Sequence, residues 1–322
     1  MMINKANRET FLDSVCAIMI IYMIYGHICL WCGIKQVEIF QRILFFFMPW
    51  FFFKSGMFFR KESLKKNILK GFKRLIVPYI LFSIMGQIVF WIMWLINGTK
   101  LGYSYIMTPL RTLFHEGAVV GNSPLWFLLT LFFVRIIFNV IFNQKINIYL
   151  CILLSIVGSF MFCYIDFHNI MYIPNTFCGL FFYMVGYLMR DKQYNKIVLF
   201  LGFLFYIVYV FIYPSYFDFR SNSVAPSYYI LCILSCLGGI IVFNNIFKKL
   251  PECNFLSYIG KNSMSYYVLH WIVLGIASII FKSIMNISAN YVLFWLYIFA
   301  NLLFLPILDI FISRENKKLL GK

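Results

Sequence analysis

The sequence predicts an all-α protein that crosses a membrane about ten times. Apolar residues make up 62% of the 322 residues, charged residues only 12%, and the mean hydropathy is +0.84. A water-soluble domain is usually about 25% charged and 45–50% apolar, so this composition excludes a soluble globular enzyme. The apolar residues also form continuous runs, whereas a transmembrane barrel has short alternating segments.

Ten apolar runs fit helical spans of about 20 residues with loops between them. Helices are expected because each one satisfies its own backbone hydrogen bonds in lipid. The first run lacks a small-residue cleavage site, so we interpret it as an uncleaved span rather than a signal peptide. The expected spans are Phe11–Trp31, Ile43–Phe59, Leu75–Leu95, Leu125–Phe142, Ile146–Tyr164, Ile173–Met189, Ile197–Tyr213, Tyr228–Phe247, Ser263–Phe281 and Val292–Phe311.

The distribution of Lys and Arg predicts that both termini are cytoplasmic. The chain has 28 Lys and Arg against 11 Asp and Glu, a net charge of +17. With the N-terminus inside, 20 of the 28 fall in cytoplasmic segments and 6 in external loops. Cytoplasmic loops are enriched in Lys and Arg, so topology and membrane lipids explain the charge better than nucleic acid does.

The chain, residues 1–322, is interpreted as a single integral-membrane domain because it shows no internal repeat and no low-complexity linker. The longest external loop, about Ile96–Pro124, is expected either to re-enter the membrane in part or to cover a site. The nine cysteines lie mostly in apolar runs, where they behave as small hydrophobes, and no cluster typical of a metal site is predicted.

Ionisable residues inside the expected spans are functional candidates, because each is costly to keep in lipid. His27 lies in the outer half of the first span, and at 100° per residue Asp13 and Cys16 share its helix face. A second histidine, His270, lies about two turns into the ninth span. The structural alternative is that a neighbouring helix simply satisfies the histidine.

The second expected span contains a proline, a lysine and a pair of small residues. Pro49 frees a backbone carbonyl, and Ser55-Gly56 permits a close helix approach or a break. Lys54 would be costly against lipid, so it either snorkels toward the cytoplasm or serves a site.

The segment from Arg60 to Arg74 holds seven cations in fifteen residues and is the densest positive patch of the sequence. Topogenic charge and attraction to anionic lipids explain such a patch without any site. The functional alternative is that Arg and Lys capture a phosphorylated cytosolic donor.

Five short motifs occur along the chain: Asp13 with Gly26-His27, Met48–Gly56, Arg74–Pro78, Ser123–Leu128, and Ile259–Ser263 with Tyr267 and His270. In this order and spacing, they together resemble the membrane-bound acyltransferase 3 family, whose multispan members acylate sugars of bacterial surface glycans. Two positions depart from the family pattern. Cys16 stands where Arg or Lys is common, and Phe47 stands where His often precedes Met-Pro. Arg8 or Lys54 is a candidate to supply the missing charge.

The resemblance implies O-acyl transfer, most simply of an acetyl group, in the bacterial cytoplasmic membrane. The donor would be cytosolic acyl-CoA (acetyl-CoA), which is a co-substrate and not a resident cofactor. The acceptor would be a hydroxyl of a surface polysaccharide or lipid-linked sugar. The expected partners are therefore the acyl-CoA, this glycan and membrane lipids.

The residues that match the motifs would then share the chemistry. His27 would be the general base that takes the hydroxyl proton. Cationic or hydrogen-bonding groups such as Lys54, Ser55 or Trp126 would stabilise the oxyanion, and basic residues would bind the CoA phosphates. The expected catalytic set is His27, Asp13, Lys54, Ser55, Trp126 and His270, and the expected donor-binding set is Arg60, Lys73 and Arg74.

Three alternatives stay open at the level of sequence. A flippase for a lipid-linked sugar would show Gly- or Pro-broken spans in matching positions of two halves, and only one such span is found. A polysaccharide polymerase would need a larger external loop with several arginines, whereas the external loops carry Arg42, Arg111 and Arg220. A multispan protein without catalysis is the third.

Overall fold

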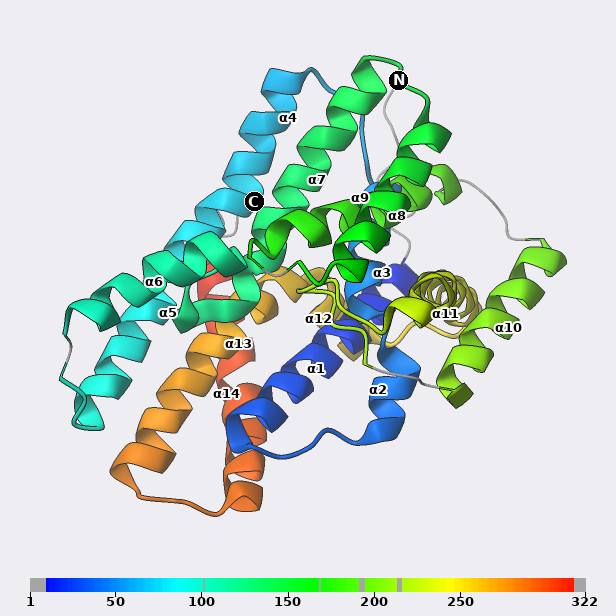
Figure 1. Ribbon diagram of the computed structural model, residues 1–322. Helices are drawn as coiled ribbons and strands as arrows, with labels where there is room; N and C mark the ends of the chain where they lie inside the picture. Colours follow the sequence, from blue (N-terminus) through cyan, green and yellow to red (C-terminus); the bar gives the residue numbers. More distant parts are fainter. Residues whose placement is uncertain (1–9, 101, 168, 191–194, 213–215, 316–322) are drawn as a thin grey trace.

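The computed structural model describes residues 10–100, 102–167, 169–190, 195–212 and 216–315 (Figure 1). Within these ranges the chain is helix and loop, apart from an isolated antiparallel bridge between Asp218 and Ser223, so the all-α prediction is confirmed. In chain order the helices are α1 (Thr10–Cys32), α2 (Glu38–Leu44), α3 (Phe47–Met57), α4 (Leu64–Gly71), η1 (Phe72–Ile76), α5 (Val77–Ile96), α6 (Tyr103–Glu116), η2 (Val120–Leu125), α7 (Trp126–Asn143), α8 (Ile148–Tyr164), α9 (Tyr172–Met189), α10 (Lys196–Ile212), η3 (Pro226–Tyr228), α11 (Tyr229–Lys249), α12 (Asn254–Lys261), α13 (Ser263–Ser278), η4 (Ile279–Ile284) and α14 (Asn290–Glu315).

Six helical segments of the described chain are long and apolar enough to cross a membrane, as expected of an integral membrane protein. Two further apolar helices, α8 and α10, have 17 residues each. The number of ten spans and the side of each terminus stay predictions. The six segments are Thr10–Cys32, Leu64–Ile96, Tyr103–Asn143, Pro226–Lys249, Ser263–Ile284 and Asn290–Ile312.

The second expected span, Ile43–Phe59, is not one continuous helix. α2 ends at Leu44, and α3 has only 11 residues. Pro49 falls in the first turn of α3. N–H groups in the first turn make no hydrogen bond within the helix, so the proline costs none there. Eleven residues rise about 16 Å, which is well short of a hydrocarbon core of about 30 Å. α3 is therefore a short helix inside the bundle.

The third expected span also begins differently, because the helix starts at Leu64 and continues through the basic segment. Pro78 lacks the N–H that would bond to the carbonyl of Arg74, and the wider π-helical turn of η1 ends two residues before it, at Ile76. Such single-turn π segments are a usual way to relieve a break in the hydrogen-bond ladder.

α3 is held against α9 by two glycines that approach the opposite backbone. A Cβ at Gly56 would lie 1.9 Å from the carbonyl oxygen of Tyr183, and one at Gly186 would lie 2.1 Å from that of Phe53. Only small residues allow helices to come this close. The close approach that Ser55-Gly56 predicted is therefore present.

The core of the bundle is formed by helices that lie far apart in the sequence. α1, α13 and α14 run side by side in Figure 1, and α3 packs between α1 and α9. The expected external loop Ile96–Pro124 folds into α6 and η2. η2 packs closely on α5, where the Gln87 side chain accepts a hydrogen bond of 3.2 Å from the Gly121 N–H.

Candidate functional site

Two histidines from opposite ends of the sequence meet in the interior of the bundle. Nδ1 of His27, on α1, lies 2.8 Å from Nε2 of His270, on α13, and the two rings are nearly parallel at 11°. His270 is fully buried, whereas His27 is partly accessible. The edge of the Trp271 ring contacts His27, with 5.1 Å between ring centroids. The two histidines that the sequence marked separately thus form one unit.

The hydrogen bonds of this pair fix which nitrogen of His27 is basic. Nδ1 of His270 lies 2.7 Å from the carbonyl oxygen of Tyr267, which can only accept, so His270 carries its proton on Nδ1. In a neutral ring Nε2 of His270 is then an acceptor, and His27 must donate from its own Nδ1. The unprotonated nitrogen of His27 is therefore Nε2. This is the arrangement that a general base requires.

His27 lines a small cavity of about 160 Å³. Its walls come from α1, α3, α7 and α13 together with two connecting segments: the end of η2, and the loop between α10 and η3. The lining is largely aromatic, and a few polar groups converge on it. The polar and aromatic lining residues are His27, Phe47, Ser123, Trp126, Tyr216, Asp218, Phe219, Arg220, Tyr267 and Trp271.

The loop that brings Arg220 to this cavity alternates buried rings with polar residues. Phe217 and Phe219 are 2% and 3% exposed, and Phe219 stacks on Phe52 at 5.2 Å between centroids. Asp218 and Arg220, the alternate residues, line the cavity. The bridge between Asp218 and Ser223, with both N···O distances at 2.9 Å, closes the turn.

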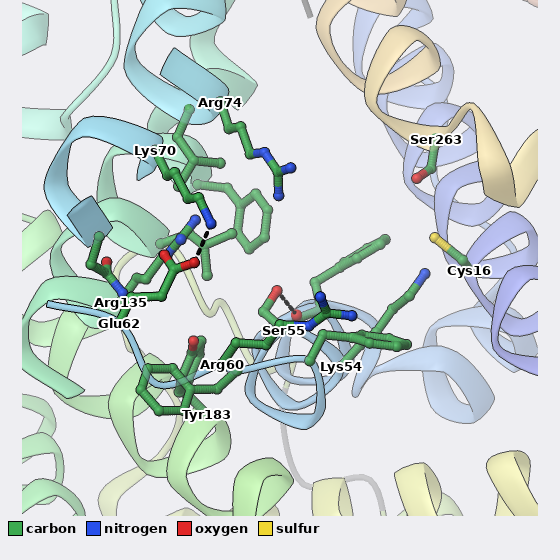
Figure 2. A pocket seen from close by; sticks show the side chains of 17 residues that line it. Cys16, Lys54, Ser55, Arg60, Glu62, Lys70, Arg74, Arg135, Tyr183 and Ser263 are labelled. Carbon is green, nitrogen blue, oxygen red and sulfur yellow. Dashed lines mark hydrogen bonds and ion pairs between the residues drawn. The ribbon is translucent and has the colours of Figure 1, made fainter. Parts of the chain in front are cut away.

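A larger cavity of about 580 Å³ lies at the end of the bundle that carries the basic segment (Figure 2). In Figure 2, Cys16 and Ser263 form one wall, and Lys70, Arg74 and Arg135 lie across from them. Lys54, Ser55 and Arg60 come from α3 and the segment after it. The cavity therefore collects five cations: Lys54, Arg60, Lys70, Arg74 and Arg135.

The described part of this basic cavity holds one carboxylate, that of Glu62. It forms an ion pair with Lys70, and this bond holds the pKa of Glu62 below its ordinary value of 4.5. The backbone carbonyl of Glu62 accepts hydrogen bonds of 3.1 Å from both Asn139 and Asn143 on α7. Glu62 thus ties the α3–α4 loop to α7 and offsets part of the positive charge.

The same four helices line both cavities, in a consistent order. On α1, Cys16 faces the large cavity and His27 the small one, and α13 runs the same way from Ser263 to Trp271. α3 and α7 run the opposite way, and the adjacent residues Trp126 and Phe127 line one cavity each. The two cavities therefore follow one another along the bundle. Eleven residues of α1 separate Cys16 from His27, a rise of about 16 Å.

Comparison with known families decides what kind of protein this arrangement belongs to. The family model Acyl_transf_3, described as an acyltransferase domain, matches residues 9–310, which is nearly the whole chain. The chain belongs to the acyltransferase 3 family. No curated protein and no solved structure matches it. The family recognised from the sequence motifs is thus confirmed, and the protein is a membrane acyltransferase.

The predicted catalytic residues of this acyltransferase do not all lie together. His27, His270 and Trp126 gather at the small cavity. Lys54 and Ser55 line the large cavity instead: the Lys54 ammonium lies 5.1 Å from the centroid of the Trp50 ring, and Ser55 donates to the Phe51 carbonyl at 2.8 Å. The expected oxyanion role requires a side chain beside His27. Lys54 and Ser55 do not lie there, because they line the other cavity.

Asp13 lies away from the lining of both cavities, although it shares a helix face with His27. It is 3% exposed and marks the place where α1 crosses α12, since a Cβ at Gly260 would lie 1.9 Å from the Asp13 carbonyl oxygen. Asp13 and His27 are fourteen residues apart, which is almost four helical turns, and over this length one helix face passes from one environment to another. Asp13 and His27 therefore lie on the same face of α1 but in different surroundings.

The predicted donor-binding residues are divided between two surfaces. Arg60 and Arg74 line the large cavity, whereas Lys73 lies on a neighbouring groove together with Lys65, Lys66 and Lys70. Arg135, on α7, also joins the wall of the large cavity.

Sequence reasoning missed two residues that line the small cavity beside His27, Arg220 and Trp271. Arg220 was counted only as an external charge, and nothing in its local sequence connects it to α1. Trp271 directly follows His270, and this adjacency was the one signal that could have drawn attention to it.

Proposed function

We propose that this acyltransferase moves an acyl group, most simply acetyl, from cytosolic acyl-CoA to a hydroxyl of a surface polysaccharide or lipid-linked sugar. The proposal rests above all on the contact between His27 and His270, which leaves Nε2 of His27 as a base at a cavity. General-base catalysis by a positioned imidazole typically contributes about 10²–10⁴-fold to such a reaction.

The large basic cavity suits the donor. Coenzyme A carries several phosphate charges, and guanidinium groups bind phosphate through paired hydrogen bonds. Arg60 and Arg74 are the proposed phosphate-binding residues, with Lys70 and Arg135 contributing charge. The predicted topology places this end of the bundle in the cytoplasm, where acyl-CoA is made.

The small cavity suits the acceptor hydroxyl and the thioester. Trp126, Tyr216 and Trp271 offer aromatic faces on which the apolar face of a sugar ring can pack, and Asp218 offers a hydrogen-bond acceptor for hydroxyls. The pantetheine arm would carry the thioester along the four shared helices, over the rise of about 16 Å between Cys16 and His27.

Direct transfer needs only the groups at the small cavity. Nε2 of His27 takes the proton of the acceptor hydroxyl as its oxygen attacks the thioester carbonyl. Collapse of the tetrahedral intermediate breaks the C–S bond, and His27 returns the proton to the CoA sulfur. No covalent enzyme intermediate is required, so Cys16 has no role in this scheme.

Mass analysis of surface glycans from cells with the wild-type gene, without it, and with His27→Ala tests the proposal. Loss of the acetyl increment in both mutant strains, with the variant still inserted in the membrane, is the expected result. Full acylation by His27→Ala would remove this residue from the mechanism. Unchanged glycan mass with stalled export would favour the flippase alternative.

A further inference from the structure

Two buried hydrogen-bond donors at the small cavity have no partner among the residues that the structure describes. They are Nε of Arg220 and Nε1 of Trp271, and both residues line the cavity into which His27 opens. Trp271 is 7% exposed. Buried N–H groups are nearly always paired, because an unpaired one loses its hydration without compensation. Two such donors around one cavity indicate that a ligand oxygen completes them.

The Arg220 side chain is held firmly in place while its Nε stays unpaired. Nη1 donates to the Ser123 hydroxyl at 2.7 Å, and Nη2 forms an ion pair with Glu116 at the end of α6. The backbone N–H of Arg220 donates to the Asp218 carboxylate at 3.0 Å, and its carbonyl accepts from the Asn175 amide at 3.0 Å.

The loop that carries Arg220 is anchored in turn by a buried polar network. The Asn222 amide donates to the Ser159 carbonyl at 2.8 Å, and the Tyr229 hydroxyl donates to the Asn222 side-chain oxygen at 2.9 Å. Ser159, Asn222 and Tyr229 are each at most 1% exposed. The guanidinium is thus preorganised by α6, α8, α9 and α11.

Trp271 is fixed by the catalytic imidazole itself. Its ring contacts His27 edge-on at 5.1 Å between centroids and packs against Trp31 at 5.3 Å. The indole N–H is a donor without acceptor character, so in a cavity it can only serve an oxygen or another acceptor.

We propose that Nε–H of Arg220 and Nε1–H of Trp271 form the oxyanion hole of the acyl-transfer reaction. The inference rests on the proposed function and replaces Lys54 and Ser55 in that role. As the acceptor oxygen bonds to the thioester carbon, the C=O π electrons move to the carbonyl oxygen and the proton passes to Nε2 of His27. The two donors bind that oxyanion. When C=O re-forms, the C–S bond breaks and the sulfur takes the proton from His27.

Preorganised donors of this kind stabilise charge that exists only in the transition state. Removal of either N–H group should lower kcat and leave the affinity for acyl-CoA nearly unchanged. The CoA phosphates, which lie in the large cavity in this scheme, do not sense the change.

The test compares Trp271→Phe with Trp91→Phe in membrane vesicles from an expressing strain, with radiolabelled acetyl-CoA as donor and the vesicle glycan as acceptor. The first change removes one N–H of the proposed hole and keeps an aromatic ring. Trp91 also has a buried, unpaired indole N–H, but it lies outside the lining of the small cavity. We expect kcat to fall about 100-fold in Trp271→Phe with KM for acetyl-CoA within about twofold, and to stay unchanged in Trp91→Phe.

A second variant separates chemistry from folding. Arg220→Ala should lose activity and regain part of it when guanidinium ion is added, whereas the same concentration of ammonium should restore none. Trp271→Phe with wild-type kcat, or equal losses in Trp271→Phe and Trp91→Phe, would overturn the oxyanion hole. If wild-type vesicles transfer no acetyl group, the proposed function itself is wrong. This outcome can be told apart from the two outcomes that contradict only the oxyanion hole.

Discussion

His27 and His270 are separated by 243 positions in the sequence, yet their ring nitrogens lie 2.8 Å apart. Because His270 also donates to the Tyr267 carbonyl, the pair forms a directed chain that ends at a free lone pair on His27. A backbone carbonyl, rather than a carboxylate, thus orients the His27–His270 pair. These two hydrogen bonds add no negative charge to a site buried in the bundle.

The first prediction concerns His270. Replacement by Ala removes the acceptor for Nδ1–H of His27, so the ring loses both its fixed tautomer and its orientation. We expect acyl transfer to fall by about tenfold to hundredfold, less than the loss in His27→Ala, because general-base catalysis supplies at most about 10²–10⁴. His270→Gln, whose amide oxygen can accept the same bond, should keep more activity than His270→Ala. Equal rates for the two variants would speak against the hydrogen-bonded chain.

The second prediction separates Arg74 from Lys73, adjacent cations on one helical segment. Only Arg74 lines the large cavity, so Arg74→Gln should raise KM for acetyl-CoA several-fold and Lys73→Gln much less. Both changes remove one positive charge, and effects on topology or on lipid attraction should therefore be similar in the two. Rates measured against acetyl-CoA concentration in vesicles distinguish the cases. Equal KM values for Arg74→Gln and Lys73→Gln would indicate that both residues only help to set the membrane topology.

The third prediction concerns Glu62, whose pKa is lowered by its bond to Lys70. A carboxylate with a lowered pKa stabilises the folded state above its unfolded value of about 4.5 and loses that contribution as the pH falls through the lower folded value. Glu62→Gln should therefore unfold at a lower temperature than wild type at pH 7, and the difference in melting temperature should close as the pH falls from 4.5 through the lower folded pKa.

The same substitution should strengthen donor binding. Without the Glu62 carboxylate, Lys70 is free to meet an anion, so KM for acetyl-CoA should fall, and the fall should shrink at high salt. An increased KM in Glu62→Gln, with the protein still folded, would show that the carboxylate supports donor binding instead of competing with it.

The fourth prediction tests the crossing of α3 and α9. Gly56→Ala places a methyl group against the Tyr183 carbonyl, at 1.9 Å without relaxation, so the helices must move apart. We expect a loss of about 1–3 kcal/mol in stability, together with reduced activity, because α3 lines both cavities. Gly202→Ala is the matched control, since its Cβ meets only ordinary contacts of 3.5 Å or more. Similar melting temperatures for the two variants would argue against the close crossing.

The helical fold, the location in a membrane and the family could all be predicted from local sequence patterns. Long apolar runs leave the backbone no hydrogen-bonding partner other than its own helix, so this outcome depends only on residues near one another in the chain. The motifs around His27, Met48–Gly56 and His270 likewise are short-range patterns. They were sufficient to recognise an acyltransferase and to single out both histidines.

Which of these residues share a cavity depends on how the helices pack against one another. Helical periodicity placed Asp13, Cys16 and His27 on one face, but the face passes from the α12 crossing to the large cavity and then to the small one. The position of Arg220 depends on α6, α8, α9 and α11 meeting around one loop. Contacts of this kind arise from side-chain packing between helices that no local pattern relates, and therefore only the packed bundle brings Arg220 and Trp271 to His27.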